Sequence, residues 1–214
     1  MQGKRRRKVG AGSVLEGQPI TFPITDANAE WDVRQSEKLF SSLKSRWELT
    51  RIVRPRGVGV ELGVADGIFS EVLLRKSNLD YLYSIDMYGD RKHTVEQYKT
   101  TLVRLAPYRS RNCILKLRFD EALPLFPDNY FDFIYIDGYA AGGQEAGNTL
   151  YDWLPKLKRG GVFAGHDYCA DWPLVVKAVD QFAADNKLRI VTVGGVSEPE
   201  DTANRYTSWF AVPA

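Results

Sequence analysis

The sequence is poor in cysteine, with only Cys113 and Cys169 among its 214 residues. Two cysteines this far apart cannot form the disulfide framework of a small secreted domain, and they match no zinc-binding spacing. We therefore expect two reduced thiols and a cytoplasmic protein. Apolar runs of membrane-spanning length are also missing, and no signal-peptide core follows the basic N-terminus, so we expect no membrane span.

A strong excess of charge of one sign is missing as well, because 29 basic residues stand against 27 acidic ones. Five of the basic residues lie together in Lys4–Lys8, which leaves the rest of the chain mildly acidic. A body of this charge does not favour nucleic acid as a partner. We predict that residues 1–28 form a flexible basic tail and arm, and that residues 29–214 form one domain with an N-terminal cap helix. Contact of the tail with an anionic polymer is the alternative.

The stretch from Gly57 to Leu74 combines a strand, a turn and a helix start. Its first part is a short Val- and Leu-rich run that includes Glu61, which is typical of a buried parallel strand. Gly63 and Gly67 then allow the backbone to approach a ligand that a Cβ would exclude. A helix N-terminus follows and presents unpaired N–H groups to an anion. The stretch predicts a nucleotide-sized cradle, and a purely structural turn is the alternative.

A second strand is predicted over residues 81–85 and ends at Asp86, 23 residues after Gly63. In a doubly wound sheet, an acid at this place accepts hydrogen bonds from the hydroxyls of a ribose bound at the first turn. Met87 beside it can lie against an adenine ring. An aspartate that caps the following loop is the structural alternative for Asp86.

Strands and helices alternate through the rest of the chain. Helical patterns cover residues 30–52, 94–105, 149–158 and 174–186, and strand patterns cover residues 113–117, 130–136, 162–165, 190–193 and 208–212. Arg159-Gly160-Gly161 predicts the end of one helix. The last two strands predict an antiparallel hairpin, because the segment between them contains Pro, Asp and Asn. Alternating strand–helix units predict an α/β, doubly wound fold.

This order of parts resembles the class I S-adenosylmethionine-dependent methyltransferases, from about Val58 to Val212. Residues 131–138 (FDFIYIDG), 157–168 (LKRGGVFAGHDY) and 176–182 (VKAVDQF) resemble one branch of that superfamily. The branch holds small-molecule and sugar O-methyltransferases, including the macrocin O-methyltransferase type, and is related to catechol O-methyltransferase. The resemblance implies a Rossmann-like seven-stranded sheet, mostly parallel with an antiparallel last strand. It also implies S-adenosyl-L-methionine as the cofactor and a small-molecule or sugar hydroxyl as the acceptor.

The resemblance implies roles for the cofactor-binding residues. Asp86 would take the ribose hydroxyls and Met87 the adenine, while Asp120, just past the third strand, would accept from the exocyclic amine of the adenine. Glu61 would orient the amino group or hold the turn, and Asp137 would line the same pocket. The turn around the methionine moiety would be shaped by Gly63, Val64, Ala65 and Gly67.

The chemistry is expected where Asp137 meets His166 and Asp167, because these residues follow neighbouring fourth and fifth strands. In metal-assisted relatives, carboxylates at these places hold Mg²⁺, which lowers the pKa of a substrate hydroxyl and orients its oxygen toward the sulfonium methyl. Here the fifth-strand pair is His-Asp, whereas those relatives usually offer two acids or Asp-Asn, and an imidazole suits softer divalent ions better. The branch also commonly has a histidine where this chain has Ala140.

These departures leave open two mechanisms for the same three residues. In the first, Asp137, His166 and Asp167 bind Mg²⁺ or another divalent cation. In the second, His166 acts as a general base at its ordinary pKa near 6.5, and Asp167 orients it. A lining residue of the cofactor pocket and a hydrogen-bonded strand end are the non-catalytic interpretations of His166.

Two other functions compete with this one. A dinucleotide-binding oxidoreductase of Rossmann type is disfavoured, because the first turn lacks the third glycine of G-x-G-x-x-G and the terminal hairpin is foreign to that class. A nucleic-acid methyltransferase would use the basic tail, and its binding would be sensitive to salt. The amphipathic segment near the N-terminus also fits a homodimer contact. The acceptor is not specified by the sequence.

Overall fold

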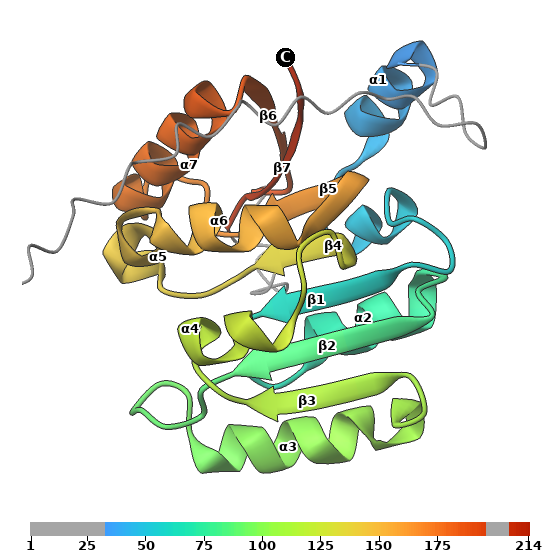
Figure 1. Cartoon of the computed structure of the whole chain (residues 1–214), viewed down its shortest axis with the longest axis vertical. Coiled ribbons are helices and arrows are strands. Elements are labelled where there is room, and N and C mark those ends of the chain that lie inside the picture. The colour runs from blue at the N-terminus through green and yellow to red at the C-terminus, as the bar shows by residue number, and fades with distance from the viewer. Residues whose placement is uncertain (1–32, 196–205) are drawn as a thin grey trace, which may run out of the picture.

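The computed structural model describes residues 33–195 and 206–214, and its main feature is one seven-stranded sheet (Figure 1). The predicted basic tail over residues 1–28 lies outside the described residues. The strands are β1 (Val58–Leu62), β2 (Tyr81–Asp86), β3 (Asn112–Lys116), β4 (Phe131–Ile136), β5 (Leu157–Gly165), β6 (Leu188–Val193) and β7 (Ser208–Pro213).

The strand order is β3-β2-β1-β4-β5-β7-β6. Strands β1 to β5 pair in parallel, whereas β7 pairs antiparallel with both β5 and β6. The predicted Rossmann-like sheet with an antiparallel last strand is therefore confirmed, and so is the terminal antiparallel pairing. Because the order reverses beside β1, the carboxyl edge next to β1 and β4 is where such sheets bind ligands.

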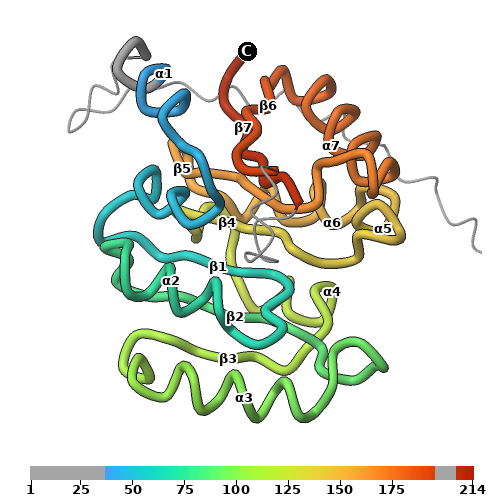
Figure 2. Tube along the Cα trace, turned by 180° about the vertical axis from the view of Figure 1, so that it is seen from behind, coloured from blue at the N-terminus to red at the C-terminus, as the bar shows by residue number. Residues whose placement is uncertain are grey.

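Helices cover both faces of the sheet, as Figure 1 and the view from behind in Figure 2 show. One face carries α1 (Val33–Ser42), α2 (Ile68–Lys76), α3 (Val95–Leu105) and the 3₁₀ turns η1 (Arg46–Arg51) and η2 (Ala106–Tyr108). The other face carries α4 (Phe119–Ala122), α5 (Gly143–Ala146), α6 (Asn148–Trp153), α7 (Pro173–Asp185) and the 3₁₀ turns η3 (Leu123–Leu125), η4 (Ala140–Gly142) and η5 (Leu154–Lys156).

Strand β4 lies in the middle of the sheet and is buried along its whole length. Ile134 and Ile136 join the hydrophobic cluster under α4, α6 and α7. Phe133 and Tyr135 point to the opposite face and join the cluster under η1 and α2. Coverage of both faces explains why residues 133–136 are all apolar or aromatic and do not alternate with polar residues.

The predicted helix over residues 30–52 is wrong in its described part, because α1 ends at Ser42 and the separate turn η1 begins at Arg46. The hydroxyl groups of Ser41 and Ser42 donate to carbonyls of the preceding turn, at 2.8 Å and 2.7 Å. Such bonds compete with regular helix continuation. Ser45 is fully extended, with φ −145° and ψ 158°, so η1 takes a new direction across the sheet.

The predicted helix over residues 149–158 is also too long, and Arg159-Gly160-Gly161 does not end it. Helix α6 stops at Trp153, Pro155 follows in η5, and β5 begins at Leu157. The two glycines lie inside β5, where the pairing with β4 jumps from Leu157 to Val162. Gly160 has φ +74°, so the glycine pair forms a bulge in the strand.

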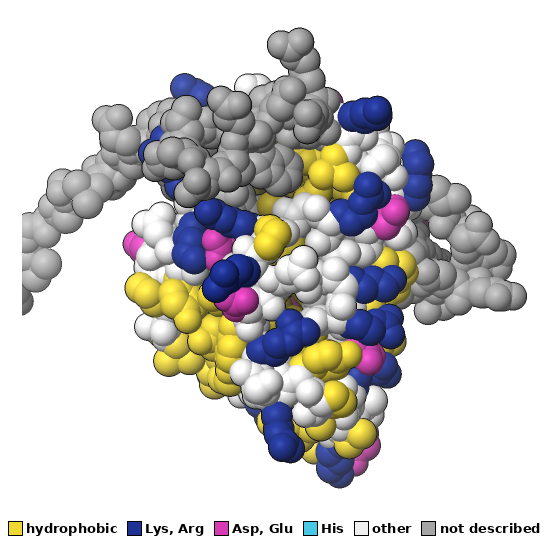
Figure 3. All heavy atoms as spheres, turned by 90° about the vertical axis from the view of Figure 1, so that its right-hand side faces the viewer, with side chains coloured by type: hydrophobic (Ala, Val, Ile, Leu, Met, Phe, Trp, Pro, Cys, Tyr) yellow, Lys and Arg dark blue, Asp and Glu magenta, His cyan; other side chains and the backbone are white. Residues whose placement is uncertain are grey.

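The edge of the sheet at which β1 to β5 begin presents many Lys and Arg side chains to the viewer in Figure 3. A surface groove at this edge is lined in part by Arg56, Arg75, Asp80 and Arg111. Arg111 is engaged there, because it donates to the carbonyl of Leu79 at 2.9 Å. Among the described residues, no helix has the length and hydropathy of a membrane span.

Candidate active site

The turn between β1 and α2 is built around Gly63, whose φ of +94° is left-handed. A Cβ placed on Gly63 would lie 1.8 Å from the carbonyl oxygen of Asp137, so only glycine fits. Gly67, at φ +77°, is the N-cap of α2. The turn therefore lies directly against the end of β4, where the predicted chemical residues begin.

Asp86 ends β2 and lies beside this turn, with only 3% of its surface exposed. One carboxylate oxygen, Oδ2, accepts hydrogen bonds from the N–H groups of Val64 at 2.9 Å and Ala65 at 3.0 Å. The spacing argument correctly placed an acid opposite the glycine turn. In this structure, however, the carboxylate already binds the turn itself, so a ribose would have to share or replace these bonds.

Two residues missed by sequence reasoning hold the turn from the side of α3. The hydroxyl groups of Tyr88 and Thr101 both donate to the carbonyl of Ala65, at 2.9 Å and 2.6 Å. Tyr88 and Ala65 both have positive φ, 41° and 47°. Non-glycine residues in this conformation are strained, and strained positions concentrate at functional sites. No sequence pattern marks Tyr88 or Thr101 for this task.

The remaining predicted cofactor residues lie in different environments. Met87 follows Asp86 and is half-buried. Asp120 is exposed in the first turn of α4, where Arg118 lies 3.0 Å away and, as its largest influence, holds the pKa of Asp120 below its ordinary value. Its predicted contact with adenine stays a prediction.

Glu61 is buried at 1% exposure on β1, beneath the glycine turn. It accepts a hydrogen bond from the hydroxyl of Ser70 in α2, and that hydroxyl lies 2.8 Å from the hydroxyl of Ser84 in β2. Burial raises the pKa of Glu61 to about 8, although Ser70 and the charge of Arg46 act in the opposite direction. This geometry supports the interpretation that Glu61 holds the turn.

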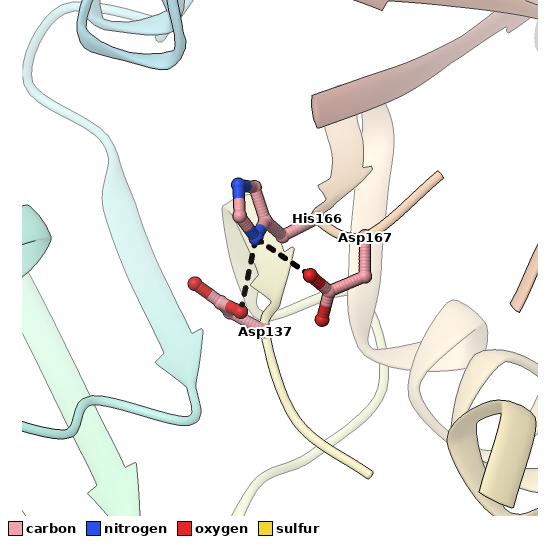
Figure 4. A group of neighbouring side chains, drawn as sticks. All are labelled: Asp137, His166 and Asp167. Atoms are coloured by element: carbon pink, nitrogen blue, oxygen red, sulfur yellow. Dashed lines mark ion pairs between the residues drawn. The ribbon is translucent and has the colours of Figure 1, made fainter. Parts of the chain in front are cut away.

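Asp137, His166 and Asp167 meet at the ends of β4 and β5, as Figure 4 shows. Ring nitrogen Nδ1 of His166 lies 3.4 Å from Oδ1 of Asp137 and 3.1 Å from Oδ1 of Asp167. The ring is 5% exposed, whereas the carboxylates are more open. The structure thus brings together the three residues that the sequence placed in one crevice.

Arg46 of η1 is a fourth member of this cluster, and it was not predicted. Its Nη2 lies 3.2 Å from Oδ2 of Asp137, and its Nη1 lies 3.5 Å from Nε2 of His166. The guanidinium carbon also lies over three aromatic rings, at 4.5 Å for Phe69, 5.2 Å for Trp47 and 5.6 Å for Tyr135. In the sequence Arg46 is one charge among several in an amphipathic segment, so nothing there distinguished it from a solvated side chain.

These contacts change the ionisation of the cluster. Burial lowers the pKa of His166, but the carboxylates of Asp137 and Asp167 outweigh burial and raise it to about 9. Burial likewise raises the pKa of Asp137, but the charges of His166 and Arg46 outweigh it and lower that pKa. The two carboxylates therefore favour the protonated form of His166, and the ordinary imidazole pKa assumed from the sequence does not apply.

Two carboxylates and one imidazole, with one ligand atom each within 4.8 Å of the others, have the composition of a site for a divalent cation. Their arrangement does not fit one. Both carboxylates converge on Nδ1 of His166, and a ring nitrogen that donates to carboxylates has no lone pair left for a metal. The other oxygen of Asp137 is bound by Arg46.

Two aromatic side chains, Tyr206 and Trp172, lie next to the cluster and are called the aromatic wall below. The ring of Tyr206 lies 6.3 Å from that of His166, and the ring of Trp172 lies 6.0 Å from that of Tyr206. After β4 the chain forms the short turns η4 and α5. Gly143 packs closely on α7 there, because a Cβ at this position would lie 2.7 Å from the carbonyl oxygen of Leu174.

Comparison with known proteins adds a family match and a set of similar folds. A family described as a methyltransferase domain matches residues 60–168. This range contains the glycine turn, Asp86 and the cluster at the ends of β4 and β5. No curated protein matches the sequence at a significant level.

Solved structures resemble the chain in fold at low sequence identity. A Klebsiella pneumoniae protein proposed to be an O-methyltransferase is 18% identical, with a TM-score of 0.58 over 90% of this chain and 84% of that one. An rRNA methylase from Streptococcus thermophilus is 12% identical, with a TM-score of 0.56 over 87% and 99%. Precorrin 8w decarboxylase from Methanobacterium thermoautotrophicum is 15% identical, with a TM-score of 0.55 over 88% and 93%. Identities this low show a shared fold alone.

Proposed function

The chain belongs to the family of methyltransferase domains, and we propose that it transfers the methyl group of S-adenosylmethionine to a hydroxyl of a small molecule or sugar. Family membership makes it an S-adenosylmethionine-dependent enzyme. It also decides against the dinucleotide-binding oxidoreductase that the sequence left as an alternative. The hydroxyl acceptor and the residue roles below are our proposal.

One observation carries the proposal. The backbone at Gly63 touches Asp137, so the cofactor turn and the cluster at the ends of β4 and β5 form one continuous site. A donor bound at the turn would therefore lie next to groups that can handle a proton. Methyl transfer needs little more than this, because the sulfonium is already activated and the protein mainly aligns oxygen, carbon and sulfur.

We assign the cofactor to the residues of the turn and of the neighbouring strand ends. Asp86 would exchange one or both of its bonds to the turn for the ribose hydroxyls, and Glu61 would support the turn from below. Met87 and Asp120 would face the adenine. The methionine moiety would lie along Gly63, Val64, Ala65, Gly67 and Asp137.

We assign the acceptor proton to the carboxylates, because His166 already carries its own proton at neutral pH. Figure 4 shows one oxygen of Asp167 directed at the ring and the other directed away from it. The second oxygen would receive the hydroxyl proton while the carbon–sulfur bond breaks and the carbon–oxygen bond forms. The products are S-adenosylhomocysteine, the methylated acceptor and a proton that passes to solvent. The aromatic wall of Trp172 and Tyr206 suits a ring-shaped acceptor.

The test has two stages, and the first concerns the cofactor. S-adenosylmethionine and S-adenosylhomocysteine should raise the melting temperature, and NAD should not. Stabilisation by NAD alone would overturn the proposal.

The described part of residues 29–214 forms one sheet, which supports treating that range as a single methyltransferase domain.

The second stage is a panel of hydroxyl acceptors, such as catechols and free or nucleotide-linked sugars, with formation of S-adenosylhomocysteine as the readout. Amines and carboxylic acids of matched size serve as controls. Asp167→Asn should abolish turnover, whereas Asp171→Asn, at an exposed position nearby, should not. Methylation of the amines alone, or of RNA in a manner that depends on residues 1–8, would contradict the proposed acceptor class.

A further inference from the structure

We propose that Arg46 occupies the place on Asp137 that a divalent cation would need, so that this enzyme positions its site with a built-in guanidinium and without a metal ion. The inference rests on the proposed methyl transfer for its relevance. In it, Arg46 is a positioning residue that acts through Asp137.

The first argument is that both oxygens of Asp137 and both ring nitrogens of His166 already face protein groups. Asp137 presents Oδ2 to Arg46 and Oδ1 to His166. His166 presents Nδ1 to both aspartates and Nε2 to Arg46. A metal ion would have to displace the guanidinium and remove the proton from Nδ1, and these are two separate costs.

The second argument is that Arg46 is fixed in its position. The residue is 7% exposed, and its guanidinium carbon lies over the rings of Phe69, Trp47 and Tyr135, at 4.5 Å, 5.2 Å and 5.6 Å. Planar guanidinium groups stack on aromatic rings in a way that compact ammonium groups do not. Rotation of Arg46 away from Asp137 would break these ring contacts and leave the carboxylate without its nearest cation.

The third argument is the balance of charge. Arg46 places a permanent positive charge 3.2 Å from Oδ2 of Asp137, which offsets the charge of that carboxylate. A carboxylate whose charge is already offset attracts a doubly charged ion poorly, and like charges at these separations repel strongly in a buried environment. Both the geometry and the charge therefore exclude the ion.

The experiment is a Mn²⁺ titration followed by electron paramagnetic resonance, on the full chain and on variants. The wild type and Asp137→Asn should bind Mn²⁺ equally weakly. Arg46→Met keeps the apolar stem and removes the charge, so it should bind Mn²⁺ about tenfold more tightly or better. Adding Asp137→Asn to Arg46→Met should abolish the gain. Arg54→Met is the matched control, because Arg54 also pairs with an aspartate of β4, at 4.0 Å, and should bind like the wild type.

Wild-type Mn²⁺ binding that Asp137→Asn removes would overturn the inference, and so would Arg46→Met binding no more tightly than the wild type. If Arg46→Met does not fold, Mn²⁺ binding by the wild type is compared with Mn²⁺ binding by Asp137→Asn, and this comparison tests whether Asp137 holds a metal ion. Equal weak binding supports the inference, and a loss of binding overturns it. S-adenosylmethionine binding is measured on the same preparations, so a failure of the proposed function is seen separately as absent cofactor binding.

Discussion

Two aspartates lie near the two ends of strand β4, and their surroundings differ. Asp132, at the beginning, accepts a hydrogen bond from the N–H of Val58 at 2.9 Å and pairs with Lys158 at 2.7 Å and Arg54 at 4.0 Å. Its side chain is 5% exposed, while those two cations are 38% and 62% exposed. Asp137, just past the other end, is 21% exposed, while its partners Arg46 and His166 are 9% and 6% exposed.

The two arrangements are reversed. At the amino edge the acid is buried and its cations are solvated. Asp132 links β4 to β1 through the N–H of Val58, and its charge is balanced by the exposed cations of Lys158 and Arg54. At the carboxyl edge the cations are buried and the acid is more open, so the buried charges of Arg46 and His166 hold Asp137 in place at the candidate site. Breaking each arrangement separately should affect stability at one edge and chemistry at the other.

The largest expected effect separates the two aspartates by activity. Asp137→Asn should lower turnover by about 10²-fold, because it removes the charge that positions Arg46 and His166 beside the bound donor. Asn keeps an acceptor for Arg46, whereas Ala would leave a buried cation unpaired and confuse the result. Asp132→Asn should leave turnover per folded molecule unchanged. Initial rates, taken where circular dichroism shows each variant folded, check this, and similar rates for the two variants would contradict it.

The second prediction concerns stability at the turn that touches Asp137. Gly63 and Gly160 both have left-handed φ, +94° and +74°, but a Cβ meets the Asp137 carbonyl at 1.8 Å in the first case and nothing within 4 Å in the second. Gly160→Ala should cost about 1 kcal/mol of unfolding free energy from backbone strain. Gly63→Ala should cost about 3 kcal/mol or more, because the backbone must also shift. Urea denaturation measures both, and equal losses would show that the turn can relax.

The third prediction concerns how the free energy of unfolding depends on pH through Glu61, which lies beneath the same turn. Glu61 ionises near pH 4.5 when unfolded and near pH 8 when folded, because burial dominates. The stability it contributes is therefore fully present below pH 4.5 and is lost as pH rises through 8. Relative to Glu61→Gln, the wild type should lose on the order of a few kcal/mol of unfolding free energy between pH 5 and pH 8. Parallel pH dependence of the two proteins in urea denaturation would contradict this.

The smallest expected effect concerns cofactor affinity. Asp86→Ala should weaken S-adenosylmethionine binding by about tenfold, because a charged hydrogen-bond acceptor is lost at the turn. Asp120→Ala should weaken it less, because Asp120 is exposed and engaged with Arg118. Calorimetric titration compares them, and a larger effect at Asp120 would mean that the ribose assignment is wrong.

Much of the fold follows from short-range pattern. The apolar runs and the acids that follow them placed Glu61, Asp86 and Asp137 at strand ends, since parallel strands align their carboxyl ends at one edge. The Gly160-Gly161 pair was misjudged because a glycine pair after a helical pattern usually ends a helix, whereas here it forms a bulge within β5.

The site was predictable only in part. Asp137, His166 and Asp167 were found because each lies at a predicted strand end. Arg46 was not, because its role depends on where η1 crosses the sheet, and that path depends on the break at Ser45. Long-range contacts of this kind leave no local pattern in a single sequence. The raised pKa of His166 was missed for the same reason, since its cause is the arrangement of its neighbours.

A crystal structure with S-adenosylhomocysteine tests the account most directly. We predict that the ribose hydroxyls bind Asp86, that the homocysteine moiety lies along Gly63, and that the sulfur faces the cluster of Asp137, His166 and Asp167. A ligand bound elsewhere on the sheet, with Asp86 still holding only Val64 and Ala65, would contradict the account.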